Sequence, residues 1–164
     1  MRAYAMKALF KRSIPFTAWF MVAIGCIGLS CPARAALGGD VTSVEADRAH
    51  LKATSLEVRP AGAYEVHAIQ APGGTVINEY VSSAGKVFAV AWHGPFIPEM
   101  QQILGSYFQQ YSAALGAKRP YGRRPLNIQQ PGLVVQTGGH MRAYVGRAYL
   151  PEMLPSGLKA DDIK

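Results

Sequence analysis

The histidines are the side chains of this sequence with the widest chemical repertoire, and they stand far apart at positions 50, 67, 93 and 140. Imidazoles and a thioether are ligands that copper accepts, so His93, His140 and Met141 form a candidate metal set. Protein metal sites usually show paired ligands a few residues apart, which these histidines do not provide. Packing or solvent exposure at strand ends is therefore favoured, and no metal ion or cofactor is predicted.

Catalytic motifs are missing from the sequence. The chain has no Gly-x-Ser-x-Gly elbow and no glycine-rich phosphate loop. Glu65 and His67 share one face of a predicted strand, but no nucleophile is placed beside them. We therefore assign no catalytic residue and favour a protein that is not an enzyme. The alternative is a small periplasmic hydrolase or carbohydrate-active enzyme, whose site would be assembled by the fold from His67, His93, His140 and nearby carboxylates.

The last predicted strand offers a candidate ligand surface. Strand alternation places His140, Arg142 and Tyr144 on one face. Arginine and tyrosine suit an anionic or sugar-like ligand, and His93 ends an earlier predicted strand. We take His93, His140, Arg142 and Tyr144 as candidate ligand-binding residues. Cross-strand pairing on a solvated face is the alternative, because exposed arginine and tyrosine are common on antiparallel sheets.

A basic linker separates two predicted elements. It contains Lys118, Arg119, Arg123 and Arg124 around Tyr121. Such a cluster can contact anionic lipid head groups or lipopolysaccharide. A solvated loop is the favoured interpretation, because runs of charge usually face water.

The N-terminus has the pattern of a secretory signal peptide. The first twelve positions hold four basic residues and no acidic one, and an apolar run follows over residues 14–30. Ala33 and Ala35 supply the small side chains that signal peptidase requires, so we expect a signal peptide over residues 1–35 and a mature chain that begins at Ala36. An uncleaved membrane anchor, a lipoprotein acylated at Cys26 or Cys31, and twin-arginine export are weaker alternatives.

Cleavage changes what the composition means. Five of the 17 basic residues lie in the signal, so the mature chain has 12 basic against ten acidic residues, a net charge of +2. The pI of about 9.6 therefore gives no argument for nucleic-acid binding. Both cysteines leave with the signal, and no membrane span is expected after cleavage. We expect one domain of roughly 130 residues, large enough to bury a core without disulfides, in the periplasm or outside the cell.

Periodicity and turn signals predict the elements that position these residues. We expect a short helix over residues 40–54 and a long amphipathic helix over residues 98–115. Strands are expected at residues 64–70, 75–82, 86–93, 125–130, 133–137 and 140–150. The predicted fold is a two-layer α+β domain over residues 36–150, with an antiparallel sheet of about six short strands, and then an extended tail over residues 151–164.

Several short motifs are shared with a known family. They are ALGGD at residues 36–40, EYVS at 79–82, GKVFAVAW at 85–92, GGHMRA at 138–143 and LPSG at 154–157. On these motifs the chain resembles the domain of unknown function 2844 family. The resemblance implies an exported bacterial protein and supplies no activity or catalytic residue. We expect an exported, non-catalytic binding or accessory module of the bacterial envelope, whose partner is a protein or another envelope component.

Overall fold

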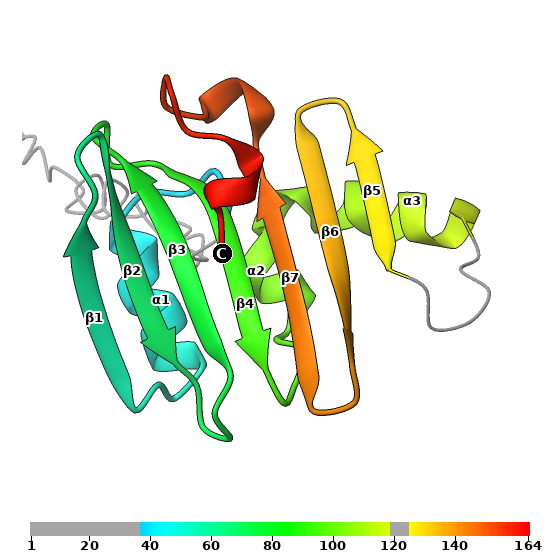
Figure 1. Cartoon of the computed structure of the whole chain (residues 1–164), viewed down its shortest axis with the longest axis horizontal. Coiled ribbons are helices and arrows are strands. Elements are labelled where there is room, and N and C mark those ends of the chain that lie inside the picture. Colours follow the sequence, from blue (N-terminus) through cyan, green and yellow to red (C-terminus); the bar gives the residue numbers. More distant parts are fainter. Residues whose placement is uncertain (1–36, 119–124) are drawn as a thin grey trace, which may run out of the picture. The chain divides into compact units, whose positions relative to one another are not determined.

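The computed structural model describes residues 37–118 and 125–164. The helices are α1 (Thr42–His50), α2 (Met100–Leu104) and α3 (Phe108–Lys118), and the strands are β1 (Ser55–Pro60), β2 (Tyr64–Gln70), β3 (Val76–Ser82), β4 (Val87–Gly94), β5 (Leu126–Gln130), β6 (Leu133–His140) and β7 (Ala143–Tyr149). The described strands form an antiparallel sheet in the order β1-β2-β3-β4-β7-β6-β5 (Figure 1). The predicted signal peptide, the cleavage site before Ala36 and residues 119–124 of the basic linker lie outside the described residues.

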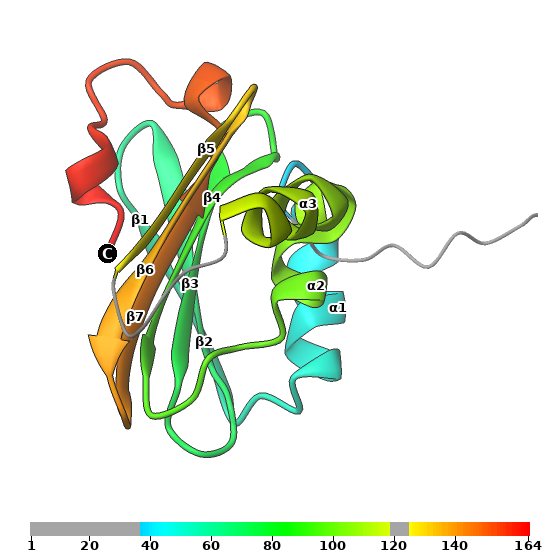
Figure 2. The ribbon, with the colours of Figure 1, turned by 90° about the vertical axis from the view of Figure 1, so that its right-hand side faces the viewer.

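The described helices lie on one face of the sheet, which gives the predicted two layers (Figure 2). Strand alternation turns Ile77 of β3 and Trp92 of β4 toward this helical layer. There they belong to the main core together with Ile103 and Leu104 of α2. Removing these apolar side chains from water is the main favourable contribution to folding of this layer.

The prediction of about six strands misses β1, which makes the sheet seven-stranded. β1 is an edge strand paired only with β2, and all its residues except Leu56 are exposed. Its sequence does alternate, with Leu56 and Val58 apolar between polar residues, but two apolar residues followed by Pro60 are too short a run to indicate a strand. Pro60 at its end suits an edge, where a missing N–H removes no sheet hydrogen bond.

The helix predicted over residues 98–115 is broken in the structure. α2 ends at Leu104, Gly105–Tyr107 form a 3-10 turn, and α3 begins at Phe108. Gly105 takes a φ of 49° with a ψ of −119°, a combination that residues with a Cβ atom avoid. The apolar spacing continues across the break, so periodicity alone does not reveal it.

The strand predicted over residues 140–150 is wrong at its start. His140 is the last residue of β6, and β7 begins at Ala143, so Met141 and Arg142 form a hairpin turn between them. Arg142 takes a φ of 64°, in the left-handed region that residues other than glycine rarely adopt. The glycine pair at residues 138–139 had indicated a turn there, but both glycines lie within β6.

The C-terminal tail, residues 151–164, was expected to be extended. Instead it forms 3-10 turns at Pro151–Met153 and Ala160–Asp162. It crosses the face of the sheet opposite the helices, in front of β4 and β7 in Figure 1. Ile163 is only 1% exposed there, so the tail is part of the folded structure.

A β-bulge supplies the surface on which the tail packs. Val81 of β3 pairs with Val87 of β4 and Tyr80 pairs with Ala89, which leaves Phe88 as an extra residue. Phe88 and Ala89 consequently both belong to the small core that contains Ile163. This half of the sheet is covered on both faces, by helices on one and by the tail on the other.

Candidate ligand groove on the open half of the sheet

A groove of about 570 Å³ lies beside the C-terminal tail, over the half of the sheet formed by β4, β7, β6 and β5. Ile163 and Lys164 of the tail line one side of it, and Pro125 and Asn127 line the side near β5. Most of the lining is apolar. We call this feature the groove.

Small residues on adjacent strands leave room for the groove. Gly138 of β6 pairs with Val145 of β7, and the next residue of β7 is Gly146. A Cβ atom added to Gly146 would lie 2.3 Å from the ring of Trp92, so the indole packs directly on this backbone. Val145 is 50% exposed and presents the apolar floor to solvent.

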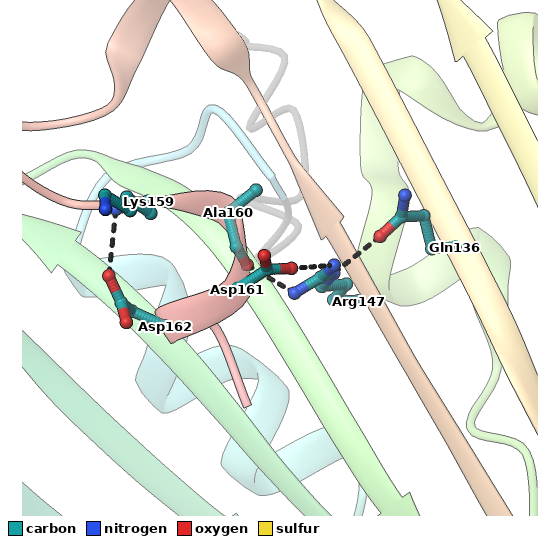
Figure 3. Close-up of polar contacts among 6 residues, drawn as sticks. All are labelled: Gln136, Arg147, Lys159, Ala160, Asp161 and Asp162. Atoms are coloured by element: carbon teal, nitrogen blue, oxygen red, sulfur yellow. Dashed lines mark hydrogen bonds and ion pairs between the residues drawn. The ribbon is translucent and has the colours of Figure 1, made fainter.

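Arg147 of β7 joins the floor of the groove to the tail (Figure 3). Its Nε donates to Oε1 of Gln136 at 2.6 Å, and its other nitrogens donate to the carbonyl oxygen of Ala160 and to the carboxylate of Asp161. The guanidinium is therefore used to fix the wall of the groove, which is a structural role.

The last residue of the tail is held by β3. The carbonyl oxygen of Lys164 accepts hydrogen bonds from the side-chain amide of Asn78 and from the hydroxyl of Tyr80, both at 2.8 Å. The N–H of Lys164 donates to the same hydroxyl at 2.9 Å. Burial raises the pKa of Tyr80, which keeps the phenol protonated and able to donate.

The four predicted ligand-binding residues do not all line the same hollow. His93 lines the groove, whereas His140 and Tyr144 line a second hollow of about 570 Å³ that shares Trp92 and Val145 with the groove. Arg142 contributes to neither lining and lies exposed on the hairpin turn. His140 pairs with Ala143, so alternation along β7 turns His140 and Tyr144 toward opposite faces of the sheet, contrary to the prediction.

The histidines of the enzyme alternative lie on three different strands. His67 of β2 is buried beneath the helices, 3.4 Å from Glu65. His93 of β4 and His140 of β6 are separated by β7. Within residues 37–118 and 125–164, no three His, Cys, Asp or Glu side chains gather in a way that could hold a metal ion.

A buried pair of carboxyl groups was not predicted. Asp47 of α1 is 1% exposed and Glu79 of β3 is 2% exposed, and their side chains are hydrogen-bonded to each other. The amide of Gln102 in α2 donates to Oδ1 of Asp47. Three elements therefore meet through polar groups inside the helical layer.

Both carboxyl groups of this pair hold protons more tightly than usual. Desolvation by burial raises the pKa of Asp47 from 3.8 to about 6, against the lowering effect of its hydrogen bonds. Burial and the neighbouring carboxylate raise the pKa of Glu79 well above its ordinary value. Two carboxyl groups can be hydrogen-bonded to each other only while one of them carries a proton, which is the state that their raised pKa values favour.

The sequence does contain a signal for this pair. Asp47 follows Val44 by three residues, on the inward side of the short first helix. Glu79 lies between Ile77 and Val81 at the same strand period. A carboxyl group at a position that periodicity marks as inward indicates a buried polar contact.

Fold and groove together define a class of protein: a small α+β domain in which an antiparallel sheet, half covered by its own C-terminal tail, carries a ligand-sized groove on its open half. The family model described as "Protein of unknown function (DUF2844)" matches residues 33–163, so the chain belongs to that family, as the motifs indicated. Neither a curated protein nor a solved structure matches this chain. None of the helices described here is long and apolar enough to cross a membrane.

Proposed function

We propose that the protein is an exported, non-catalytic binding module of the bacterial envelope, and that the groove holds an elongated apolar part of its ligand. The observation that carries the proposal is the groove itself. Its volume of about 570 Å³ falls within the range of about 300–1,000 Å³ that is usual for small-ligand sites. The N-terminal pattern of a signal peptide supports the export component of the proposal.

The chemistry of the lining favours binding over catalysis. Val145, Pro125 and Leu126 offer apolar contact, and Gln136 offers an amide at the polar side of the groove. Arg147 is already held by three partners, so it is not available as a reacting group. Apolar surface with a few polar groups at its margin selects a ligand by shape and orients it.

A matched pair of valine variants tests the groove. Val145 is 50% exposed in the groove, and Val58 is 48% exposed on β1 at the far edge of the sheet. Val145→Glu places a charge on the apolar floor, whereas Val58→Glu adds the same charge and the same strand substitution elsewhere. Both variants should keep the wild-type fold, because each side chain is half exposed.

The immobilised proteins are then incubated with a fractionated envelope extract. We expect an envelope component that the wild-type protein and Val58→Glu retain and that Val145→Glu loses by at least tenfold. Equal retention by all three proteins, or retention by none, would remove the groove as the binding site. Turnover of the retained component by the wild-type protein would instead support the enzyme alternative.

A further inference from the structure

The exposed apolar side chains of this protein are concentrated at one end of the sheet. Among the described residues, the large apolar side chains with high exposure are Val58, Phe96, Ile97, Met141 and Val145. All but Val58 lie on or beside the loop from β4 to α2 and the hairpin turn from β6 to β7, at the lower end of Figure 1. We call Phe96, Ile97 and Met141, which are 61%, 55% and 72% exposed, the apolar tip.

The loop that carries Phe96 is fixed in place. The hydroxyl of Thr75 donates to the carbonyl oxygen of Phe96 at 3.0 Å and accepts from its N–H at 3.2 Å. The ring of Phe96 passes so close to Gly73 that a Cβ atom there would be 3.0 Å away. Because Thr75 bonds both the N–H and the carbonyl oxygen of Phe96, the loop backbone is already ordered with the ring outside the core. Binding through this ring therefore needs no further ordering of the loop.

The two loops of the apolar tip share a hollow. Ile97 and Met141 both line it, together with the buried Trp92 and the partly exposed Tyr144. Ile97 and Met141 are therefore grouped around one hollow, and Phe96 precedes Ile97 in the chain. Exposed apolar side chains that gather in this way differ from the single ones that any protein surface carries.

Two cations and one carboxylate lie in the described loops at the end of the sheet that carries the tip. Arg142 follows Met141 directly, and Lys52 lies on the turn between α1 and β1 at the same end of the sheet. In the described loops at this end, residues 51–54, 71–75, 94–99 and 141–142, Glu99 is the acidic residue, and its carboxylate lies 3.2 Å from His50. With Glu99 paired to His50, an apolar tip that has Arg142 beside it and Lys52 at the same end of the sheet is complementary to an anionic lipid surface.

The small size of the tip favours a lipid surface over a protein partner. A stable protein interface buries about 800 Å² on each side, whereas even an aromatic side chain contributes only about 150–250 Å². Three partly exposed side chains do not reach that area. A bilayer has no such minimum, because each apolar side chain enters the boundary between head groups and acyl chains separately while the cations stay among the head groups.

We propose that the apolar tip docks on an anionic lipid bilayer, with Phe96, Ile97 and Met141 at the acyl boundary and with Arg142 and Lys52 against lipid phosphates. This docking surface lies at the end of the sheet and is distinct from the contacts that the proposed function assigns to the groove. The protein would then present the groove at a fixed height above the lipid surface.

Vesicle sedimentation tests the proposal with purified protein whose N-terminus has been determined by sequencing. Vesicles of equal parts phosphatidylglycerol and phosphatidylcholine are compared with pure phosphatidylcholine. We expect the wild-type protein to bind the anionic vesicles more tightly, and Ile97→Ser combined with Met141→Ser to weaken this binding at least tenfold. Arg142→Gln should weaken it about fivefold, the effect of losing one cation near an anionic surface. Val58→Ser is the matched control and should bind like the wild-type protein.

A second readout reports on the tip directly. The fluorescence of Phe96→Trp should shift to shorter wavelength on anionic vesicles, and raising the salt from 0.05 to 0.5 M should reverse the shift. Equal binding by the wild-type protein and the tip double variant would overturn the proposal. It would also be overturned if the wild-type protein binds no vesicles but the double variant loses a protein captured from the envelope extract. The groove is judged separately, by the Val145→Glu comparison.

Discussion

The buried carboxyl pair of Asp47 and Glu79 should make the stability of this protein fall as the pH rises. In the unfolded chain both groups ionise near their ordinary pKa values, whereas burial keeps them protonated to higher pH in the folded chain. Unfolding therefore releases protons, and the free energy of unfolding is highest below pH 4 as far as this pair is concerned. The loss begins near pH 4 and continues above pH 6.

The size of the effect follows from the two shifts. Raising the pKa of Asp47 from 3.8 to about 6 corresponds to about 3 kcal/mol lost as the pH passes from 4 to above 6, at about 1.4 kcal/mol per pKa unit. The raised pKa of Glu79 adds a further loss in the same direction as the pH rises.

Glu79→Gln isolates this contribution. The amide has nearly the shape of the carboxyl group, cannot ionise, and can donate a hydrogen bond to the Asp47 carboxylate. Urea unfolding at pH 6, 7 and 8 should show the variant gaining stability relative to the wild-type protein as the pH rises, because the variant lacks the raised pKa of Glu79. Glu57→Gln, at a side chain that is 69% exposed, is the control and should follow the wild-type curve. Parallel curves for Glu79→Gln and the wild-type protein would refute the raised pKa of Glu79.

Three further outcomes are expected. Gly146→Ala should lower the free energy of unfolding by about 1–3 kcal/mol and change the fluorescence of Trp92, because the new Cβ atom would lie 2.3 Å from the indole ring. Gly116→Ala is the control: a Cβ atom there meets nothing within 4 Å, so this variant should be neutral or stabilising. Arg147→Gln removes the bond to Asp161 and should speed amide hydrogen exchange in the C-terminal tail while the helical layer stays protected. N-terminal sequencing of the exported protein should begin Ala-Leu-Gly-Gly-Asp at Ala36; a start at Met1 would refute signal cleavage.

The central strands could be predicted from the sequence because both of their signals are strong. The predicted ranges 64–70, 75–82 and 86–93 correspond to β2, β3 and β4, within a residue or so at their ends. Gly73 and Gly85 take positive φ in the turns between these strands, as the turn prediction required. Local turn chemistry and apolar alternation agree here, and neither needs tertiary information.

The candidate site was less predictable because it depends on one turn. The hairpin between β6 and β7 turns at Met141 and Arg142, and neither residue type favours a turn over a strand. Placing the turn at Gly138 and Gly139, three residues too early, put His140 and Tyr144 on one strand and therefore on the same face. The groove itself depends on the packing of Ile163 and Lys164 against distant strands, which no local pattern encodes.

The position of β7 in the sheet has a consequence for how the chain acquires its structure. β4 pairs on one side with β3, its neighbour in sequence, but on the other side with β7, which begins at Ala143. While the chain is incomplete, β4 therefore presents an unpaired apolar edge, a known template for aggregation. Contacts between such distant segments also form slowly, since a long loop must close first. The nascent chain should consequently be most prone to aggregation until residues 143–149 are available to pair with β4.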